Sequence, residues 1–285
     1  MSRNNFKIFD AHLHTYGVFL QPNESLVQYM DRFNVEKAII TTINRTKFHN
    51  RRKEIVSNND KEFKPADFMD DFKRLMPKGQ LDHQDVIDIA KKDPKRFCKF
   101  FWFNPKIDTE EVETSYKILE EHFKDGFRGV KIHSAFNMIK VPRDIINLIS
   151  FMQDFDKNLI FYIHSLPKTS FFNGCSPNDI AKLAKQFPEL RIIVGHAGYA
   201  MEYAIEVGLT LTKFENIFFE TSCSLSFAIY NLIKTVGHKR ILFGSDSPTA
   251  SSLPLEIDKI LTLPRTSTEI MQDILYNNVT NLLKQ

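Results

Sequence analysis

Short runs of apolar, β-branched and aromatic residues alternate along this chain with longer segments whose apolar positions recur at helical spacing. This alternation is typical of strand–helix units in a parallel sheet. The runs that read as strands are 6–12, 36–42, 98–103, 127–132, 159–163, 191–195, 215–220 and 240–244. Eight strands alternating with helices is the count of a (β/α)8 barrel, so we predict this α/β fold as a single domain over residues 1–285.

Two helix starts can be predicted from residue types. Ser176, Pro177 and Asp179 suit the N-cap, the first position and the third position of a helix. Pro142 is predicted to open another helix, whose apolar residues continue to Phe155.

Residues 44–80 interrupt the alternation with a connection far longer than the few residues that normally follow a strand. They hold ten Lys or Arg residues and six Asp or Glu residues, a net charge of +4. In a barrel, such a segment lies on the face where active sites occur. We predict a lid-like insertion, in which Arg45 and neighbouring basic residues attract an anionic substrate. The alternative is a solvated lid or a dimer surface.

The composition is that of an ordinary globular protein, with 42% hydrophobic and 26% charged residues. The net charge of +3 is too small to argue for nucleic acid as a partner. No run approaches the ~20 apolar residues of a membrane span, and no signal peptide is recognisable. The cysteines, Cys98, Cys175 and Cys223, lack metal or disulfide spacing, so we expect a reduced, cytoplasmic protein.

Histidine and aspartate side chains stand at the ends of the predicted strands. His12 and His14 are two residues apart on the first strand, so they point to one face. Four further strand ends carry His133, His164, His196 and Asp246. A lone histidine at a strand end is more often an ordinary surface or core residue, but the ends of all barrel strands meet on one face. The set therefore predicts a metal centre, with zinc the first choice and manganese or iron as alternatives.

Several of these segments resemble the amidohydrolase superfamily of metal-dependent barrel enzymes, in particular the amidohydrolase-2 branch, which includes aminocarboxymuconate semialdehyde decarboxylase. The segments that carry the resemblance are Asp10–His14, Gly129–His133, Phe161–His164, Val194–Gly198, Leu242–Pro248 and Tyr276–Leu283. They span nearly the whole chain in the order of the family.

The resemblance implies a role for each of these residues. His12, His14 and Asp246 would bind the metal, with His164 as a further ligand. His196 would be a catalytic histidine near the metal-bound water, or a ligand of a second metal. Asp246 would also accept the proton of the attacking water. The resemblance is compatible with a homodimer.

The fourth strand leaves alternatives open. Val130 and Ile132 suit the outer side of a barrel, so Lys131 and His133 are predicted to point inward. Lys131 is either carboxylated and bridges two metals, or it is a buried lysine paired with a carboxylate or the substrate; we favour the second. His133 either contacts the substrate or hydrogen-bonds a ligand.

Other residues are weaker candidates for lining the pocket. Asn104, Trp102, Glu220 and Tyr199 all lie near predicted strand ends. Cys223 has no matched base and is interpreted as a small buried residue rather than a nucleophile.

The predicted activity is metal-dependent hydrolysis of a small-molecule amide, ester or lactone by an activated water. The nearest alternative is non-oxidative decarboxylation at the same site. A DNase of the TatD type is disfavoured, because such enzymes usually carry a glutamate where this chain has Lys131-Ile132-His133. A ligand-binding barrel without activity is disfavoured by the intact set of metal-binding residue types.

Overall fold

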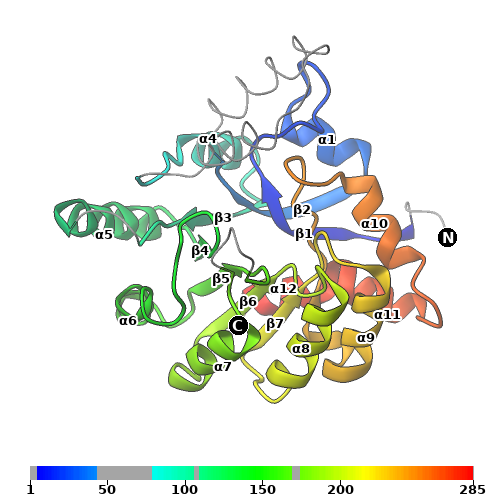
Figure 1. The fold of residues 1–285 in the computed structure, drawn as a ribbon. Coiled ribbons are helices and arrows are strands. Elements are labelled where there is room, and N and C mark those ends of the chain that lie inside the picture. The colour runs from blue at the N-terminus through cyan, green and yellow to red at the C-terminus, as the bar shows by residue number, and fades with distance from the viewer. Residues whose placement is uncertain (1–4, 44–78, 106–108, 169–173, 285) are drawn as a thin grey trace, which may run out of the picture.

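The computed structural model describes residues 5–43, 79–105, 109–168 and 174–284. The strands of these residues form one parallel sheet in chain order (Figure 1). They are β1 (Ile8–His14), β2 (Val35–Thr41), β3 (Phe97–Trp102), β4 (Gly129–His133), β5 (Ile160–His164), β6 (Arg191–Gly195), β7 (Ile217–Glu220) and β8 (Ile241–Leu242). The eight strands predicted from the sequence are therefore confirmed, with bounds that shift by a few residues.

The two edge strands of this sheet meet along a seam. The backbone N–H of Ala11 donates to the carbonyl of Phe243 across 2.8 Å, and a parallel bridge joins Leu13 to Ser247. These contacts curl the sheet into a nearly closed barrel, because β1 contacts both β2 and the end of β8. The predicted single-domain (β/α)8 fold is confirmed.

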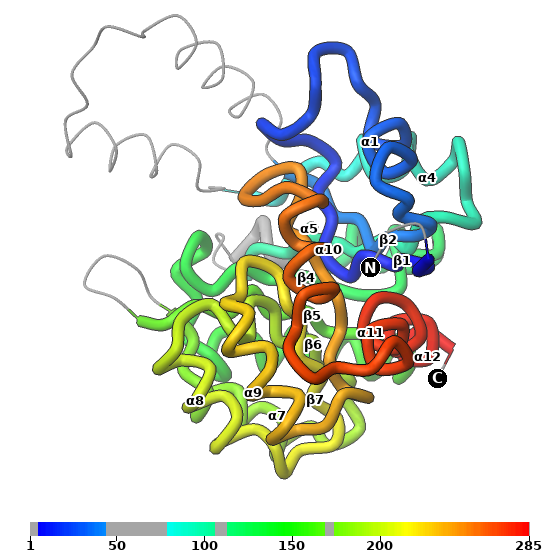
Figure 2. The backbone as a smooth tube through the Cα atoms, turned by 90° about the vertical axis from the view of Figure 1, so that its right-hand side faces the viewer, coloured from blue at the N-terminus to red at the C-terminus, as the bar shows by residue number. Residues whose placement is uncertain are grey.

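Helices alternate with the strands and surround them (Figures 1 and 2). They are α1 (Leu26–Arg32), α4 (Gln84–Lys92), α5 (Thr109–Lys124), α6 (Ile146–Phe155), α7 (Pro177–Gln186), α8 (Met201–Leu211), α9 (Ser226–Val236), α10 (Leu253–Leu261), α11 (Thr268–Gln272) and α12 (Asn278–Lys284). A short 3-10 helix spans His238–Arg240, and a π-helical turn spans Asp273–Asn277. Figure 2 shows the C-terminal helices α11 and α12 beside the N-terminal strand β1.

Apolar side chains of most strands divide between two clusters. In β5, Phe161 and Ile163 belong to the larger cluster shared with the surrounding helices, whereas Ile160 and Tyr162 belong to a smaller one. This alternation is the period of two expected of a strand. The smaller cluster also contains Phe9, Ala11, Ile39, Phe100, Ile193 and Leu242 from other strands, with Val279 and Leu282 of α12.

Helix α12 lies at the end where the strands begin. Its Asn278 side chain donates to the carbonyl of Ile241, the first residue of β8, across 2.8 Å. The carbonyl of Leu282 accepts from Arg191, the first residue of β6, across 2.7 Å. Apolar side chains of α12 therefore fill this end of the barrel, and the buried polar residues gather toward the opposite end.

The two predicted helix starts differ in outcome. Helix α7 begins as predicted, with the Ser176 hydroxyl accepting from the backbone N–H of Asp179 across 3.2 Å. The prediction that Pro142 opens a helix is wrong, because α6 begins at Ile146. The backbone N–H of Ile145 bonds instead to the carbonyl of Pro142, three residues earlier, which closes a separate turn before the helix.

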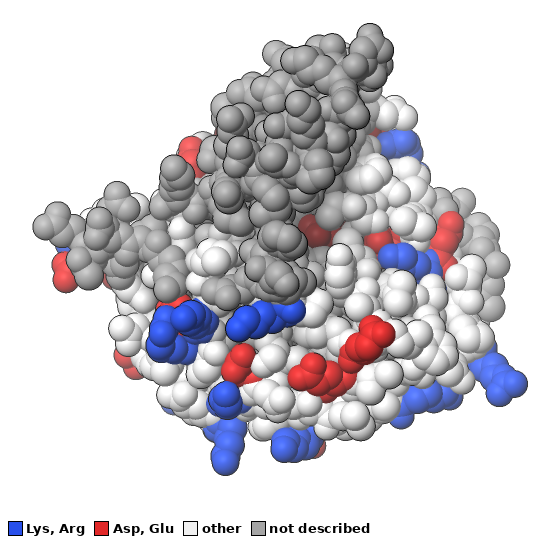
Figure 3. All heavy atoms as spheres, in the orientation of Figure 1, with Lys and Arg blue, Asp and Glu red and all other residues white. Residues whose placement is uncertain are grey.

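Charged side chains are interspersed on the face shown in Figure 3, where Lys and Arg of the described residues lie among Asp and Glu. Among the described helices, none is both long enough and apolar enough to cross a membrane. The predicted lid-like insertion, residues 44–80, lies outside the described residues except for Gly79 and Gln80.

Candidate metal centre

An irregularity in β1 turns His12 and His14 into the barrel. Asp10 pairs with Ala38 and Leu13 with Ile40, so the first strand contains one residue more than its partner over this stretch. Such a β-bulge reverses which side chains face inward. Before it, Phe9 and Ala11 pack inside the barrel; after it, Leu13 joins the outer core and the two histidines face the interior.

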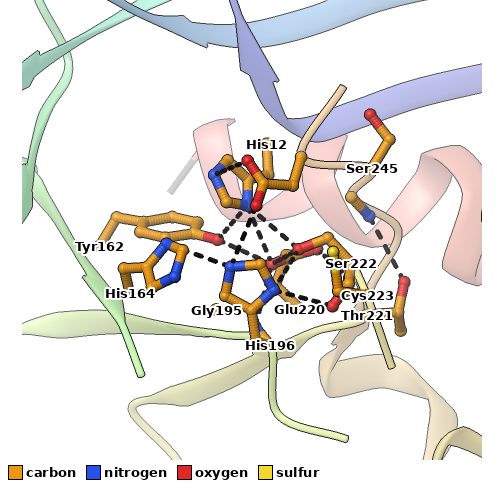
Figure 4. Close-up of polar contacts among 12 residues, drawn as sticks. His12, Tyr162, His164, Gly195, His196, Glu220, Thr221, Ser222, Cys223 and Ser245 are labelled. Carbon is orange, nitrogen blue, oxygen red and sulfur yellow. Dashed lines mark hydrogen bonds and ion pairs between the residues drawn. The ribbon is translucent and has the colours of Figure 1, made fainter. Parts of the chain in front are cut away.

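Four of the predicted residues converge at this end of the barrel. One ligand atom from each of His12, His164, His196 and Asp246 lies within 4.8 Å of the others, and all four side chains are buried. His14 is next to them, with its Nε2 3.1 Å from Oδ1 of Asp246. Figure 4 shows His12 of β1, His164 of β5 and His196, which directly follows β6, pointing toward one another. The structure thus brings together the residues that the sequence singled out.

Two of these residues adopt backbone conformations that are uncommon outside glycine. His196 has φ of 58° directly after β6, and Asp246 has φ of 54° shortly after β8. Left-handed conformations cost free energy in residues with a Cβ, and they concentrate at functional sites. Here they turn both side chains inward at the end of the strand.

Nε2 of His14 and the Asp246 carboxylate, which face each other, are both hydrogen-bond acceptors. Nδ1 of His14 lies 3.3 Å from the carbonyl oxygen of Thr42, which can only accept, so the ring proton is on Nδ1 and Nε2 carries a lone pair. Burial lowers the pKa of His14, which favours this neutral form. The negative charge of Asp246 repels this lone pair, and a cation placed between them relieves the repulsion. The donor set of imidazole nitrogens and a carboxylate therefore fits a divalent metal ion.

Lys131 supplies a positive charge within the cluster. Its Nζ lies 2.5 Å from Nε2 of His12 and 3.1 Å from Nε2 of His14. As predicted, it points into the barrel, and burial lowers its pKa to about 8. Asp246 and Glu220 favour the charged form of this lysine, because both carboxylates are close enough to stabilise the ammonium.

Stacked aromatic rings of His133, Phe136 and Trp102 lie next to the cluster. The ring of His133 stacks on His164 with centroids 3.6 Å apart and on Phe136 with centroids 3.9 Å apart. Trp102 stacks on the same imidazole at 5.7 Å, and Lys131 lies 5.1 Å from the Trp102 ring. The backbone N–H of Phe136 donates to Nδ1 of His133, so the neutral ring carries its proton on Nε2. Burial lowers the pKa of His133 well below its ordinary value, in agreement with a neutral ring.

The remaining predicted residues lie in different surroundings. Asn104 is buried, and its amide lies 3.5 Å from the carbonyl of Gly79. Tyr199 is 46% exposed. Burial raises the pKa of the Cys223 thiol, which disfavours a thiolate nucleophile. Arg45 lies outside the described residues.

A second layer of polar residues, only one of which the sequence pointed to, supports the histidines. Glu220 is fully buried and receives hydrogen bonds from the Tyr162 hydroxyl at 2.7 Å and the Ser222 hydroxyl at 2.8 Å. The hydroxyl of Tyr162 also lies 2.7 Å from Nδ1 of His12 (Figure 4). The sequence could have pointed to Tyr162, because it is two residues before His164 on β5 and therefore lies on the same face of the strand.

The pKa values of Asp246, His12 and Asp10 are shifted in different directions by burial and by neighbouring charges. Burial by itself raises the pKa of Asp246, but the neighbouring imidazoles hold that pKa well below its ordinary value. Burial lowers the pKa of His12 to about 3, with a smaller contribution from the Lys131 charge. Asp10, which accepts from the backbone of His12 at 2.9 Å and of Ser245 at 3.0 Å, has a pKa raised well above its ordinary value by burial. It ties β1 to the segment that carries Asp246.

A protein-family model described as Amidohydrolase matches residues 64–284 of this chain. A comparison with curated proteins gives no match.

Solved structures with the same fold include enzymes of two reaction types. The 2,6-dihydroxybenzoate decarboxylase from Rhizobium is 14% identical, with a TM-score of 0.63 over 98% of each chain. A dihydroxybenzoic acid decarboxylase from Polaromonas, with bound manganese and the inhibitor 2-nitroresorcinol, is 17% identical, with a TM-score of 0.62 over 98% of this chain and 97% of that one. A putative 2-pyrone-4,6-dicarboxylic acid hydrolase from Pseudomonas putida is 13% identical, with a TM-score of 0.60 over 98% of each chain.

Proposed function

Since this chain belongs to the amidohydrolase family, we propose that it is a metal-dependent hydrolase that acts on a small-molecule amide, ester or lactone through an activated water. The observation that carries this proposal is the convergence of His12, His164, His196 and Asp246 on one point, with His14 beside them. The family and this cluster together support a divalent metal.

His12, His14, His164 and Asp246 are the residues that would hold the metal. Zinc is our first choice, because histidine and carboxylate ligands suit it, while manganese or iron would accept the same donors. The Polaromonas structure contains manganese. A divalent ion bound here would lower the pKa of a water molecule and polarise a substrate oxygen.

Asp246 and His196 would move the protons. Oδ2 of Asp246 lies 3.5 Å from Nε2 of His196, so a proton taken from the attacking water by the carboxylate has a nearby acceptor. As the water oxygen bonds to the carbonyl carbon and the bond to nitrogen or oxygen breaks, the leaving group takes up this proton. Nδ1 of His196 lies 2.9 Å from the carbonyl of Ser222, which holds the ring in place.

Lys131, His133 and Asn104 are proposed to bind the substrate. The ammonium of Lys131 would attract an anionic group, and Nε2–H of His133 would donate to a substrate oxygen. The same role for Arg45 rests on the charge of its segment in the sequence alone.

Decarboxylation of a carboxylated substrate is the second candidate. It is favoured by the Rhizobium and Polaromonas structures, both of which are decarboxylases. It is also compatible with the buried ammonium of Lys131, which would bind a carboxylate. In that reaction a carbon–carbon bond breaks, CO₂ leaves, and the remaining carbon takes up a proton.

Product analysis in heavy-oxygen water tests the proposal. The metal-loaded protein is incubated with a panel of lactones, esters and amides and, separately, with carboxylated aromatic rings. We expect one heavy oxygen in the product of the first panel and no turnover by the Asp246→Asn variant. Release of CO₂ without heavy-oxygen incorporation would assign the chain to the decarboxylases instead.

A further inference from the structure

We propose that Glu220 is a positioning residue that fixes which ring nitrogen of His12 and of His196 carries the proton, and thereby turns both Nε2 lone pairs toward the metal centre. This inference shares one assumption with the proposed function, that the cluster of histidines and Asp246 binds a metal, and it does not depend on the reaction. It is carried by the direction of each hydrogen bond around Glu220 (Figure 4).

The carboxylate of Glu220 accepts every hydrogen bond it makes with its neighbours. The backbone N–H of Ser222 donates to Oε1, and the backbone N–H of His196 donates to Oε2 across 3.3 Å. Backbone N–H groups can only donate, so both oxygens act as acceptors. The hydroxyls of Tyr162 and Ser222, at 2.7 and 2.8 Å from Oε2, then donate to the same carboxylate.

Each of these hydroxyls has a single proton, which is directed at Glu220. A tyrosine hydroxyl has an ordinary pKa of about 10, so it keeps its proton near neutral pH and donates it to Oε2 of Glu220. Toward His12 both hydroxyls can therefore only accept, and they lie 2.7 and 3.1 Å from its Nδ1. His12 must carry its proton on Nδ1, which leaves the lone pair on Nε2.

The same reasoning applies to His196. Its Nδ1 lies 3.0 Å from the Ser222 hydroxyl and 2.9 Å from the Ser222 carbonyl, and neither oxygen has a proton to offer. The Nε2 atoms of His12 and His196 lie 3.4 and 3.5 Å from Asp246, on the metal side of the rings. The ammonium of Lys131, which can only donate, lies 2.5 Å from Nε2 of His12 and agrees with this assignment.

Two glycines leave the space that this arrangement needs. A Cβ atom at Gly195 would lie 2.2 Å from the Tyr162 hydroxyl, and one at Gly244 would lie 2.1 Å from Oε1 of Glu220. Any other residue at either position would displace the tyrosine or the carboxylate. The strand ends that present His196 and Asp246 are therefore shaped around the Tyr162–Glu220 pair.

The first test reads the ring protons directly, by nitrogen NMR of the histidines in metal-free wild-type protein, assigned with His12→Ala and His196→Ala. We expect Nδ1 to be protonated and Nε2 unprotonated in both rings. Protonation on Nε2 in either ring would overturn the proposal. This measurement needs no Glu220 variant to fold and does not depend on whether the protein is an enzyme.

The second test measures zinc affinity by competition with a chromophoric chelator. Glu220→Gln replaces a carboxylate oxygen with an amide NH₂, which cannot accept the hydrogen bonds that Glu220 receives. We expect the Kd of this variant for zinc to rise about 10- to 100-fold, as for other residues that orient metal ligands. Tyr162→Phe removes one acceptor but leaves Ser222, so a smaller rise is expected. Unchanged zinc affinity in both variants would contradict the proposal.

Glu256→Gln is the matched control. Glu256 on α10 is 2% exposed and accepts hydrogen bonds from Ser251, Lys259 and the backbone N–H of Cys223, without an imidazole partner in the described contacts. We expect it to lose thermal stability without a change in zinc affinity or ring protonation. If wild type binds no zinc, but its Nδ1 protons are lost in Glu220→Gln, the proposed function fails and this inference stands. If zinc binds equally to all variants, this inference fails and the metal centre stands.

Discussion

The backbone N–H of Asp246 donates a hydrogen bond to the carbonyl oxygen of His12 across 2.8 Å, and its side chain lies 3.4 Å from Nε2 of the same histidine. Asp246 follows the last strand, β8, and His12 belongs to the first strand, β1. The seam that closes the barrel is therefore also the place where two candidate ligands meet. Assembly of the site depends on closure of the fold.

Asp246→Asn should strongly lower turnover without unfolding the protein. The amide keeps the size of the carboxylate but removes the charge and the proton acceptor, so we expect a loss of about 10²–10⁴-fold in kcat/KM. Asp273→Asn is the control, because Asp273 is also buried but pairs with Lys239 and His238. Comparable activity of Asp246→Asn and wild type would remove Asp246 from the mechanism.

His196→Ala should lose turnover but keep most of the bound metal. His196 contacts both His164 and Asp246, at 3.1 and 3.5 Å, and is proposed to move protons rather than to hold the ion. Activity and metal content are measured on the same preparation, with the partly exposed His238→Ala as control. Loss of the metal together with activity would instead make His196 a ligand.

Lys131→Met should bind divalent metal at least as tightly as wild type. The ammonium lies against the Nε2 atoms of His12 and His14, so its charge competes with a metal ion for the same lone pairs. We also expect a higher KM for substrates that carry a carboxylate. If Lys131 were carboxylated, the wild-type mass would increase by one CO₂ and the variant would lose a metal equivalent.

The metal-free protein should lose stability as the pH falls from 7 to 5. Burial lowers the pKa values of His12, His14, His83, His133 and His164. Below the ordinary histidine pKa of about 6.5, these histidines bind protons in the unfolded chain but stay neutral in the folded chain. Each such histidine then lowers the free energy of unfolding by roughly 1.4 kcal/mol per pH unit. Asp10, whose pKa is raised, has the opposite effect, because the folded chain can bind one proton there that the unfolded chain does not.

Denaturant unfolding in the presence of a chelator, repeated across this pH range, measures the effect. The stability contributed by these histidines is complete above pH 6.5 and declines below it, so the midpoint should move to lower denaturant concentration. A midpoint that is constant or rises toward pH 5 would show that these rings are not buried in neutral form.

The strands and their polar ends could be predicted because each feature is local. The segment 191–195 contains the apolar run Ile192–Val194 and is followed by His196, and the structure gives β6 the same bounds. The spacing of His12 and His14 likewise placed both rings on one face. That this face is the inner one could not be read from the sequence, because it depends on the extra residue that β1 contains opposite β2.

The layer behind the histidines was largely missed for a related reason. Tyr162 reads as an ordinary aromatic strand residue and Ser222 as a loop residue, and their roles depend on contacts with Glu220 and His12 from other strands. The start of α6 was misjudged because proline at position 142 suits a turn as well as a helix.

Metal content per chain tests the central claim most directly. Elemental mass spectrometry is applied to protein purified without chelator, beside the His12→Ala/His14→Ala double variant. We expect wild type to hold about one equivalent of zinc or manganese, as in a mononuclear site, and the double variant to hold none. No metal in wild-type protein, even after reconstitution, would contradict the proposed metal centre and the hydrolytic mechanism built on it.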